Sequence, residues 1–379
     1  MTVEGVHTQT SRASKRQVRY HHASMKLPAD KVALLRTFYE GAEVCVTGGA
    51  GFIGGHLVDA LLSLGARIRV LDDLSNSTLE HLSGLIDLDP ERVRFIQGSV
   101  LDDEAVSDAV AEEAIVFHLA AIGSVPRSIE QPQRTWSVNA TGTLRVLEAA
   151  RAANARRVVA ASSSSVYGDQ PELPKVESMA LRPKSPYAAS KAASEHLLAS
   201  WSHSYGLSTV ALRYFNVFGP RQPADSAYSA VVAAFAKKLI AGEQPVIFGD
   251  GSNTRDFTFV SNAVLATLLA GAAVGSFTGQ PINVGVGTRT SIADLARIMA
   301  NHMANHIGNH MGNHSSSQIG NHIANHAVPI FKESRSGDVA HSLADIAQAR
   351  QLLGYEPIAA VEEGLAETIG WYKRALAGA

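Results

Sequence analysis

Between residues 44 and 212 the apolar residues cluster in short runs, separated by longer amphipathic stretches. The runs are rich in valine, isoleucine and alanine, which is typical of strands buried on both faces of a parallel sheet. They predict strands at 44–47, 70–72, 93–96, 115–119, 157–161 and 208–212. The stretches between them predict helices, for example at 52–64, 143–152 and 188–202. This alternation predicts an α/β fold with a Rossmann-like, doubly wound parallel sheet and helices on both faces.

The pattern changes after Asn216, where short segments rich in Gly and Pro mix with helices such as 230–240. At 379 residues the chain exceeds the usual size of a single core, so we expect two lobes. The expected units are an N-terminal extension at 1–40 with a short helix at 29–39, a Rossmann domain at 41–216 to which 259–290 return, and a smaller α/β substrate-binding lobe made of 217–258 and 291–379. Residues 1–26 are polar and basic and are predicted to be a disordered extension, with a targeting or binding arm as the alternative.

Residues 301–326 form a low-complexity insert in which Asn-His pairs recur at 301, 305, 309, 313, 321 and 325. Histidines four residues apart share a helix face, and that spacing can ligate zinc or nickel. The repeat contains no carboxylate to support such a ligand set. The favoured interpretation is therefore a repeat-expanded surface loop without a metal site.

The charge and the cysteine content limit the partners and the cellular location that we expect for this protein. The 33 basic and 35 acidic residues give a net charge of −2, which predicts no general attraction to nucleic acid or membrane. Cys45 is the only cysteine and lies in an apolar run, so we expect a buried thiol and no internal disulfide. No apolar run approaches the roughly 20 residues of a membrane span, and the N-terminus has no hydrophobic signal core. These features predict a cytoplasmic protein.

A glycine-rich turn follows the first predicted strand, with Gly48, Gly51 and Gly54 at G-x-x-G-x-x-G spacing. Such a turn lets the backbone approach a pyrophosphate, and the helix N-terminus supplies N–H groups to it. Asp72 ends the second strand, 18 residues after Gly54, where an acid can bind ribose hydroxyls. The arrangement predicts dinucleotide binding, and Asp72 favours NAD over NADP because a carboxylate repels a 2′-phosphate.

Tyr187 and Lys191 are four residues apart and would share one face of the predicted helix. A lysine ammonium, together with the positive nicotinamide ring, would favour the phenolate and lower the pKa of Tyr187. Such a tyrosine can take a proton from an alcohol while the cofactor takes a hydride. The serine run 162–165 is expected nearby, at the carboxyl end of the fifth strand.

Together these motifs resemble the extended short-chain dehydrogenase/reductase superfamily. Within it, the chain is similar to the UDP-sugar 4-epimerase branch, especially the UDP-N-acetylhexosamine 4-epimerases of bacterial polysaccharide pathways. The resemblance covers residues 42–300 and 328–375. The supporting stretches are 118–121, 124–128, 160–169, 213–219, 254–257 and 335–342.

The resemblance implies roles for individual residues. Ser163 would hydrogen-bond the sugar O4, Tyr187 would be the base, and Lys191 would bind the nicotinamide ribose. Further residues implied on the cofactor side are Phe52, Ile53, Ser99, Val100, Leu119, Ala120 and Ala121. On the substrate side they are Gly123, Ser124, Arg127, Ser164 and Ser165, with Asn216, Arg255 and Arg335 on the diphosphate, Asp338 on the uridine ribose, and the backbone around Val246 and Phe248 at the uracil. A homodimer through helices at 140–153 and 187–203 is also implied.

Ser164 and Ser165 separate the neighbouring reactions of this superfamily. Related 4,6-dehydratases carry an Asp-Glu pair at these positions, and related decarboxylases carry a Glu in the same segment. With serines there, the favoured reaction is inversion at C4 through a 4-keto sugar, with a resident NAD. The alternatives are a nucleotide-sugar dehydrogenase or reductase that releases NADH and a non-catalytic nucleotide-sugar-binding protein.

Ser342 bears on the substrate, because the family has a gate position seven residues after the arginine matched to Arg335. A small residue there admits N-acetyl sugars. We therefore expect UDP-GlcNAc/UDP-GalNAc, or their uronic acids, rather than UDP-Glc/UDP-Gal. Ser99 departs from the family, which usually has Asp near the adenine, and this puts the strength of NAD binding in doubt.

Overall fold

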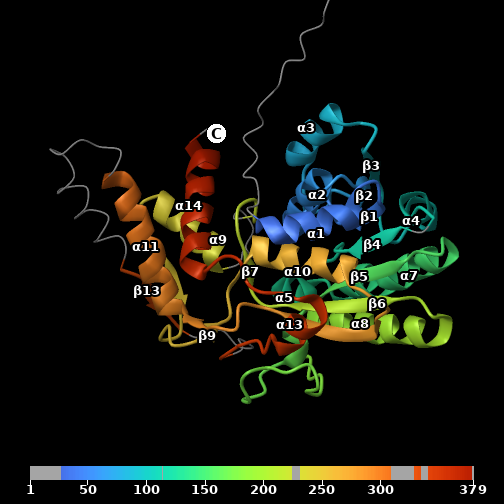
Figure 1. The fold of residues 1–379 in the computed structure, drawn as a ribbon. Coiled ribbons are helices and arrows are strands. Elements are labelled where there is room, and N and C mark those ends of the chain that lie inside the picture. Colours follow the sequence, from blue (N-terminus) through green and yellow to red (C-terminus); the bar gives the residue numbers. More distant parts are fainter. Residues whose placement is uncertain (1–26, 113, 224–230, 309–327, 334–339, 378–379) are drawn as a thin grey trace, which may run out of the picture.

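A seven-stranded parallel sheet forms the centre of the computed structural model, which describes residues 27–112, 114–223, 231–308, 328–333 and 340–377 (Figure 1). In spatial order its strands are β11 (Thr278–Val284), β6 (Thr209–Tyr214), β5 (Arg157–Ser163), β4 (Ile115–His118), β1 (Glu43–Thr47), β2 (Arg67–Asp72) and β3 (Val93–Gln97). This is the doubly wound order, with an additional edge strand. The predicted fold class is confirmed.

The apolar strands are buried on both faces because their side chains alternate between two cores. On β1, Val44 and Val46 belong to one hydrophobic cluster and Cys45 to the other. On β5, Val159 belongs to the first cluster and Val158 to the second. Continuous apolar runs of this kind therefore specify a central sheet rather than a half-exposed one.

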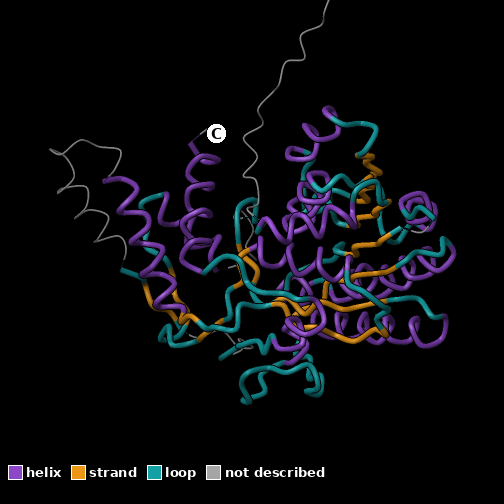
Figure 2. The backbone as a smooth tube through the Cα atoms, in the orientation of Figure 1, coloured by secondary structure: helices purple, strands orange, loops and turns teal. Residues whose placement is uncertain are grey.

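Helices cover both faces of the sheet, as the backbone tube shows (Figure 2). Those packed on the first cluster are α1 (Ala29–Tyr39), α2 (Phe52–Ser63), α3 (Glu80–Leu88) and α10 (Val260–Ala272). Those packed on the second are α4 (Asp103–Ala109), α7 (Gly142–Ala152) and α8 (Pro186–Tyr205). The short α5 (Val125–Glu130), α6 (Pro132–Trp136) and the π-helical turn Ser137–Thr141 connect β4 to α7. A 3₁₀ turn, Ser164–Tyr167, follows β5.

The strand order reverses beside β1, which pairs with β2 on one side and with β4 on the other. Loops that leave the carboxyl ends of β1 and β4 diverge here, one to each face of the sheet. In open α/β sheets such a switch point opens a crevice for ligands. The glycine-rich turn follows β1 directly, so the fold places it at this crevice.

A second group of elements packs beside the sheet domain (Figure 1). Its helices are α9 (Val231–Ile240), α11 (Ile292–Gly308) and α14 (Val361–Ala377), and α13 (Ala347–Leu353) precedes α14. Three two-stranded pairs accompany them: β7 (Val217–Phe218) with β10 (Thr258–Phe259), β8 (Val246–Phe248) with β13 (Ile330–Lys332), and β9 (Thr254–Arg255) with β12 (Thr290–Ser291). The apolar faces of α9, α11 and α14 join the first cluster, so the two parts share a continuous core.

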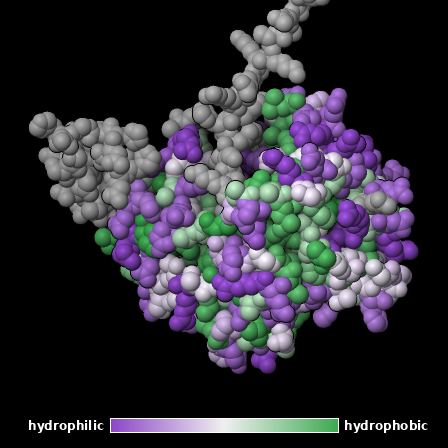
Figure 3. Space-filling view, viewed as in Figure 1, coloured by the Kyte–Doolittle hydropathy of each residue, from purple (hydrophilic) through white to green (hydrophobic). Residues whose placement is uncertain are grey.

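The surface seen in Figure 3 intersperses hydrophilic and hydrophobic side chains over the described residues. Cys45 is buried and free, as predicted. Within the described ranges, no helix is both long and apolar enough to cross a membrane. The same ranges hold no group of three or more His, Cys, Asp or Glu side chains suited to a metal ion.

The predicted insert at 301–326 divides into two parts. Residues 301–308 continue α11, so the beginning of the Asn-His repeat is helical rather than a surface loop. Residues 309–326 lie outside the described residues, as do 1–26.

Candidate active site

A cleft with a volume of about 1210 Å³ opens at the carboxyl edge of the sheet. It begins at the glycine-rich turn, passes the end of β5 and reaches β9 in the second group of elements. The predicted residues that line it are Gly48, Gly51, Phe52, Ile53, Gly54, Asp72, Val100, Leu119, Ala120, Ala121, Gly123, Ser124, Arg127, Ser163, Ser164, Ser165, Tyr187, Lys191, Asn216, Arg255 and Ser342. The fold therefore brings most of the predicted site together.

The glycine-rich turn needs glycine for steric reasons. Gly48 has a φ of +72°, and a Cβ there would lie 2.6 Å from the backbone nitrogen of Ala120. A Cβ on Gly54 would lie 2.1 Å from the carbonyl oxygen of Gly48. Gly51 is the N-cap of α2 and has no side chain to bond the first amides of the helix. Those amides border the cleft, where they can donate to a phosphate.

Asp72 anchors the wall of the cleft next to this turn. Its Oδ2 accepts from the backbone nitrogen of Ala50 at 3.0 Å. Its Oδ1 accepts from the backbone nitrogen of Leu74 at 2.9 Å and from Ser77 Oγ at 3.0 Å. The carboxylate is thereby fixed at the cleft, where its oxygens suit ribose hydroxyls. With the amides of α2, these groups fit the ribose and pyrophosphate of an NAD molecule.

Ser163, Tyr187 and Lys191 converge from two elements. Ser163 ends β5, and α8 begins with Pro186 after Ser185, whose Oγ caps the helix by accepting from the backbone nitrogen of Ala188 at 3.1 Å. The Ser163 side chain hydrogen-bonds the Tyr187 phenol. The buried Lys191 Nζ donates to the carbonyl of Ala161 at 2.7 Å. The α8 face therefore presents a phenol and an ammonium to the end of β5.

The electrostatics of these groups differ from the sequence prediction. Burial raises the pKa of Tyr187 above its usual value, and the hydrogen bond with Ser163 opposes that rise. A lowered pKa was predicted from Lys191 acting together with the nicotinamide charge; in the protein chain alone, desolvation of the phenolate dominates. Burial also lowers the pKa of Lys191 to about 8, against the attraction of Glu195.

The side of the cleft that was predicted to bind the substrate is a connected set of contacts. Asn216 has a φ of 34°, and its Nδ2 donates to Ser342 Oγ and to the carbonyl of Asp256, both at 3.1 Å. The buried Ser342 donates its backbone N–H to the carbonyl of Thr254 at 3.0 Å. Arg255 Nη1 donates to the same carbonyl at 3.0 Å. The predicted gate residue thus touches a predicted diphosphate ligand.

Asp256 organises the loops behind these residues. It is fully buried and accepts from the backbone nitrogens of Val286, Gly287 and Ala344 at 2.9–3.1 Å. Burial raises the pKa of its carboxyl to about 6, and these three donors oppose the rise. Asp256 was not predicted, although its position directly after Arg255 was a readable signal.

Several predicted residues lie outside the cleft wall or outside the described residues, and one lines the cleft but has a protein partner. Ser99, Val246 and Phe248 are described but do not belong to the cleft wall. Ser99 Oγ instead accepts from the backbone nitrogen of Leu101 at 3.2 Å, and the other two lie on β8. Arg127 lines the cleft but donates to Asn76 Oδ1, on the loop that follows Asp72. Arg335 and Asp338 lie outside the described residues.

Other cleft residues were missed from the sequence. They include the loop 75–77, Lys184 and Gln222. Lys184 is ion-paired with Asp169 at the rim, and Gln222 follows the Gly219–Pro220 turn. In the sequence, Lys184 lies close to Tyr187 and Gln222 lies close to a glycine turn. Neither position specifies a role by itself.

A parallel sheet of this order that brings a serine, a tyrosine and a lysine beside a dinucleotide turn defines the extended short-chain dehydrogenase/reductase class. The family model described as GDP-mannose 4,6 dehydratase matches residues 45–368, and the chain belongs to that family.

Its relatives include epimerases. A UDP-glucose 4-epimerase of Mycolicibacterium smegmatis is 39% identical over 331 residues, which cover 86% of this chain and 97% of that protein. The structure of a UDP-N-acetylglucosamine 4-epimerase from Methanobrevibacter ruminantium, in complex with UDP-N-acetylmuramic acid, has a TM-score of 0.78 and 35% identity, and covers 89% of this chain and 99% of its own. A Thermus thermophilus UDP-glucose 4-epimerase in complex with NAD has a TM-score of 0.72 and 32% identity, with coverage of 88% and 99%.

Proposed function

We propose that this chain is an NAD-dependent UDP-sugar 4-epimerase that inverts C4 of a UDP-hexose through a 4-keto sugar. The observation that carries the proposal is the convergence of Ser163, Tyr187 and Lys191 on one cleft, with serines rather than carboxylates at 164 and 165. Elimination of water or loss of a C6 carboxylate requires an additional acid or base, whereas inversion of C4 does not. The related epimerases and the NAD complex among them support this choice.

NAD, when bound, supplies reversible acceptance of a hydride. The groups suited to hold it are the amides at the start of α2, the Asp72 carboxylate and the Lys191 ammonium. Tyr187 Oη takes the proton from the sugar O4 and returns it after the keto sugar has turned its other face. Ser163 holds O4 by a hydrogen bond during both transfers. The lysine charge favours the phenolate that burial disfavours.

The space inside the cleft also supports a choice between acetylated and plain sugars as substrates. A Cβ added to Gly123 would meet no atom within 4 Å, and Ser342 is small, so both positions leave space beside the sugar. We propose UDP-GlcNAc/UDP-GalNAc, or their uronic acids, as substrates in preference to UDP-Glc/UDP-Gal. Ser342→Tyr should then reduce turnover of the acetylated sugar selectively. Equal losses on both kinds of sugar would contradict a gate at this position.

The deciding experiment is incubation with UDP-GlcNAc, UDP-GlcNAcA and UDP-Glc without added NAD⁺, followed by NMR of the products. Appearance of the C4 epimer would support the proposal, and Tyr187→Phe should reduce the rate about 10²- to 10⁴-fold. An undiminished rate in that variant would contradict the mechanism. Release of NADH, with loss of NAD during gel filtration, would indicate a net dehydrogenase instead.

Two further expectations belong to this proposal. The second group of elements would bind the UDP portion through Asn216 and Arg255. The active form would be a homodimer that uses α7 and α8, which size-exclusion chromatography with light scattering can test.

A further inference from the structure

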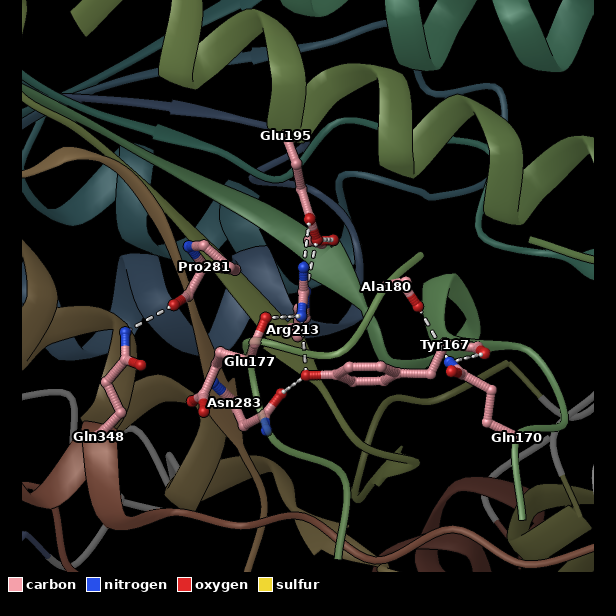
Figure 4. A network of polar contacts seen from close by, with 10 residues as sticks. Tyr167, Gln170, Glu177, Ala180, Glu195, Arg213, Pro281, Asn283 and Gln348 are labelled. Carbon is pink, nitrogen blue, oxygen red and sulfur yellow. Dashed lines mark hydrogen bonds and ion pairs between the residues drawn. The ribbon is translucent and has the colours of Figure 1, made fainter. Parts of the chain in front are cut away.

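Helix α8 carries a buried carboxylate one turn beyond Lys191. Glu195 points from α8 toward Arg213 on β6 (Figure 4). Arg213 Nε donates to Glu195 Oε1 at 2.9 Å, and Arg213 Nη2 donates to Oε2 at 2.7 Å. The two side chains are only 3% and 6% exposed, so this bidentate pair is removed from water.

The same carboxylate reaches the strand that ends in Ser163. Glu195 Oε1 also accepts from Ser162 Oγ, and Ser162 is the neighbour of Ser163 in the chain. Ser162 therefore faces α8 from within β5. Glu195 thus joins α8, β5 and β6 at one point directly behind the proposed catalytic groups.

Arg213 extends the connection to Tyr167 and to the edge strand β11. Its Nη1 donates to Tyr167 Oη at 2.8 Å, and Tyr167 Oη donates to Asn283 Oδ1 at 2.6 Å (Figure 4). Asn283 Nδ2 donates in turn to the carbonyls of Lys175 and Asp345, at 2.8 and 3.2 Å. Asp345 lies three residues after Ser342. The pair is therefore continuous with the segment that forms the substrate side of the cleft.

A second buried arginine shows what a purely structural role looks like. Arg157 begins β5, at the opposite end from Ser163, and is 6% exposed. Its Nη1 donates to the carbonyls of Ala270, Gly271 and Ala273, each at 2.9 Å. It contacts none of the residues proposed for catalysis in the described chain. Arg157 therefore provides a matched control for a buried arginine remote from the reaction.

We propose that Glu195 is a positioning residue, which fixes Ser163 relative to Tyr187 and Lys191 by holding Ser162 and Arg213 on one carboxylate. The inference rests on the proposed epimerase function. It predicts that loss of the carboxylate disturbs turnover more than substrate binding, because the displaced groups act on O4 and not on the nucleotide.

Glu195 also contributes to the charge environment of Lys191. The charged and titratable groups near Lys191 are Tyr187 and Glu195 on α8, His118 on β4, and Arg213 on β6 behind Glu195. Of these, Glu195 favours the ammonium. Its neutralisation should therefore lower the pKa of Lys191, an effect that a merely structural role would not produce.

The test uses the full-length holoenzyme with Glu195→Gln, which keeps the side-chain shape. We expect kcat to fall at least about tenfold while KM changes less than about threefold. The alkaline limb of the kcat profile should move about one pH unit lower, and NMR titration of ¹³Cε-labelled lysine should show the same shift for Lys191. Ser162→Ala removes one contact and keeps the ion pair, so kcat should fall by about two- to tenfold with no shift of the limb.

Arg157→Lys is the control and should lower thermal stability without moving the pH profile. Unchanged kcat and an unchanged Lys191 titration in Glu195→Gln would overturn the proposal. So would losses of kcat that follow stability equally in Glu195→Gln and Arg157→Lys. If Glu195→Gln fails to fold, unchanged kcat in Ser162→Ala would overturn it. A wild-type protein that epimerises no UDP-sugar would refute the proposed function, while the Lys191 titration would still test the role of Glu195.

Discussion

Two buried polar networks hold α8, one through Ser190 and Ser194 and the other through Glu195, and they use different chemistry. The neutral network consists of Thr47, His118, Asn139, Thr143, Ser190 and Ser194. The ion-pair network consists of Ser162, Tyr167, Glu195, Arg213 and Asn283. The first connects α8 to β1 and β4, whereas the second connects α8 to β5, β6 and β11.

The neutral network contains no charge in the folded protein. His118 Nδ1 lies 2.8 Å from Thr47 Oγ1, and its Nε2 lies 3.0 Å from Thr143 Oγ1. Burial, and secondarily the Lys191 charge, lower the pKa of His118 to about 3, so the imidazole is neutral at physiological pH. Each contact in such a network contributes a modest amount, and the loss of one leaves only polar groups unpaired.

The ion-pair network behaves differently because removal of one partner leaves a charge without its counterion in a dry interior. It also joins residues far apart in the sequence, from Ser162 to Asn283 and on to Asp345. The comparison teaches that α8 is held toward β1 and β4 by hydrogen bonds of moderate strength. It is held to β5, β6 and β11 through an ion pair in which the loss of either partner leaves a buried charge.

Arg213→Ala should have the largest effect on stability. It leaves Glu195 buried and unpaired, so the free energy of unfolding should fall by about 3–5 kcal/mol in urea titrations. The double variant Arg213→Met with Glu195→Leu should recover part of this loss, since neither charge remains. If Arg213→Ala lowers the free energy of unfolding by less than about 1 kcal/mol, the two networks do not differ in the way described here.

Asn139→Ala breaks the neutral network at its centre and should cost less, about 1–3 kcal/mol. The amide Oδ1 accepts from the backbone nitrogen of Ile122 at 2.8 Å, and Nδ2 donates to Ser190 Oγ at 2.9 Å. Ser190→Ala is the milder control, because it removes only one of these contacts. If Asn139→Ala destabilises the protein as much as Arg213→Ala, charge is not what separates the networks.

His118 gives the neutral network a pH signature. The folded protein keeps this imidazole unprotonated, whereas the unfolded chain protonates it near pH 6.5, so the unfolded state binds the additional proton as the pH falls. Its contribution is fully present above pH 6.5 and declines below that value, by up to about 1.4 kcal/mol per pH unit. His118→Gln should flatten the dependence between pH 6.5 and 5 in parallel urea titrations. An equal slope in both proteins would show that His118 does not titrate in this way.

Lys184→Ala should have the smallest effect on stability. Lys184 pairs with Asp169 at the rim of the cleft, where the two side chains are 55% and 50% exposed. We expect a change within about 1 kcal/mol, and less at high salt. Thermal unfolding at two salt concentrations would check it, and a larger salt-independent loss would mean that the exposed pair acts like the buried one.

The sequence was sufficient to predict those site residues whose arrangement depends on residues close to them in the chain. The turn at Gly48–Gly54, the acid at Asp72 and the pair Tyr187/Lys191 are local patterns tied to a strand end or a helix face, and all of them line the cleft. Asn216 and Ser342 were placed on the substrate side only by family resemblance, and the structure brings them into direct contact.

The ion-pair network could not be predicted in the same way. Glu195 lies on the same helical periodicity as Lys191, but its partner is on the next strand, and nothing local distinguishes a buried arginine from an exposed one. The roles of Tyr167 and Asn283 depend on contacts 46 and 116 residues apart. The role predicted for Ser99 at the cofactor stays a prediction, and in the structure its Oγ accepts from the backbone nitrogen of Leu101.

The edge strand β11 has a consequence for how the protein is made. The sheet is complete only when residues 278–284 pair with β6, and Asn283 on that strand accepts the Tyr167 hydroxyl. A nascent chain that has emerged only as far as β10 therefore exposes one edge of β6 and lacks Asn283, the acceptor of the Tyr167 hydroxyl. Such an edge invites pairing with other chains during synthesis. Nascent chains from which β11 has not yet emerged should consequently be the ones that depend on chaperones.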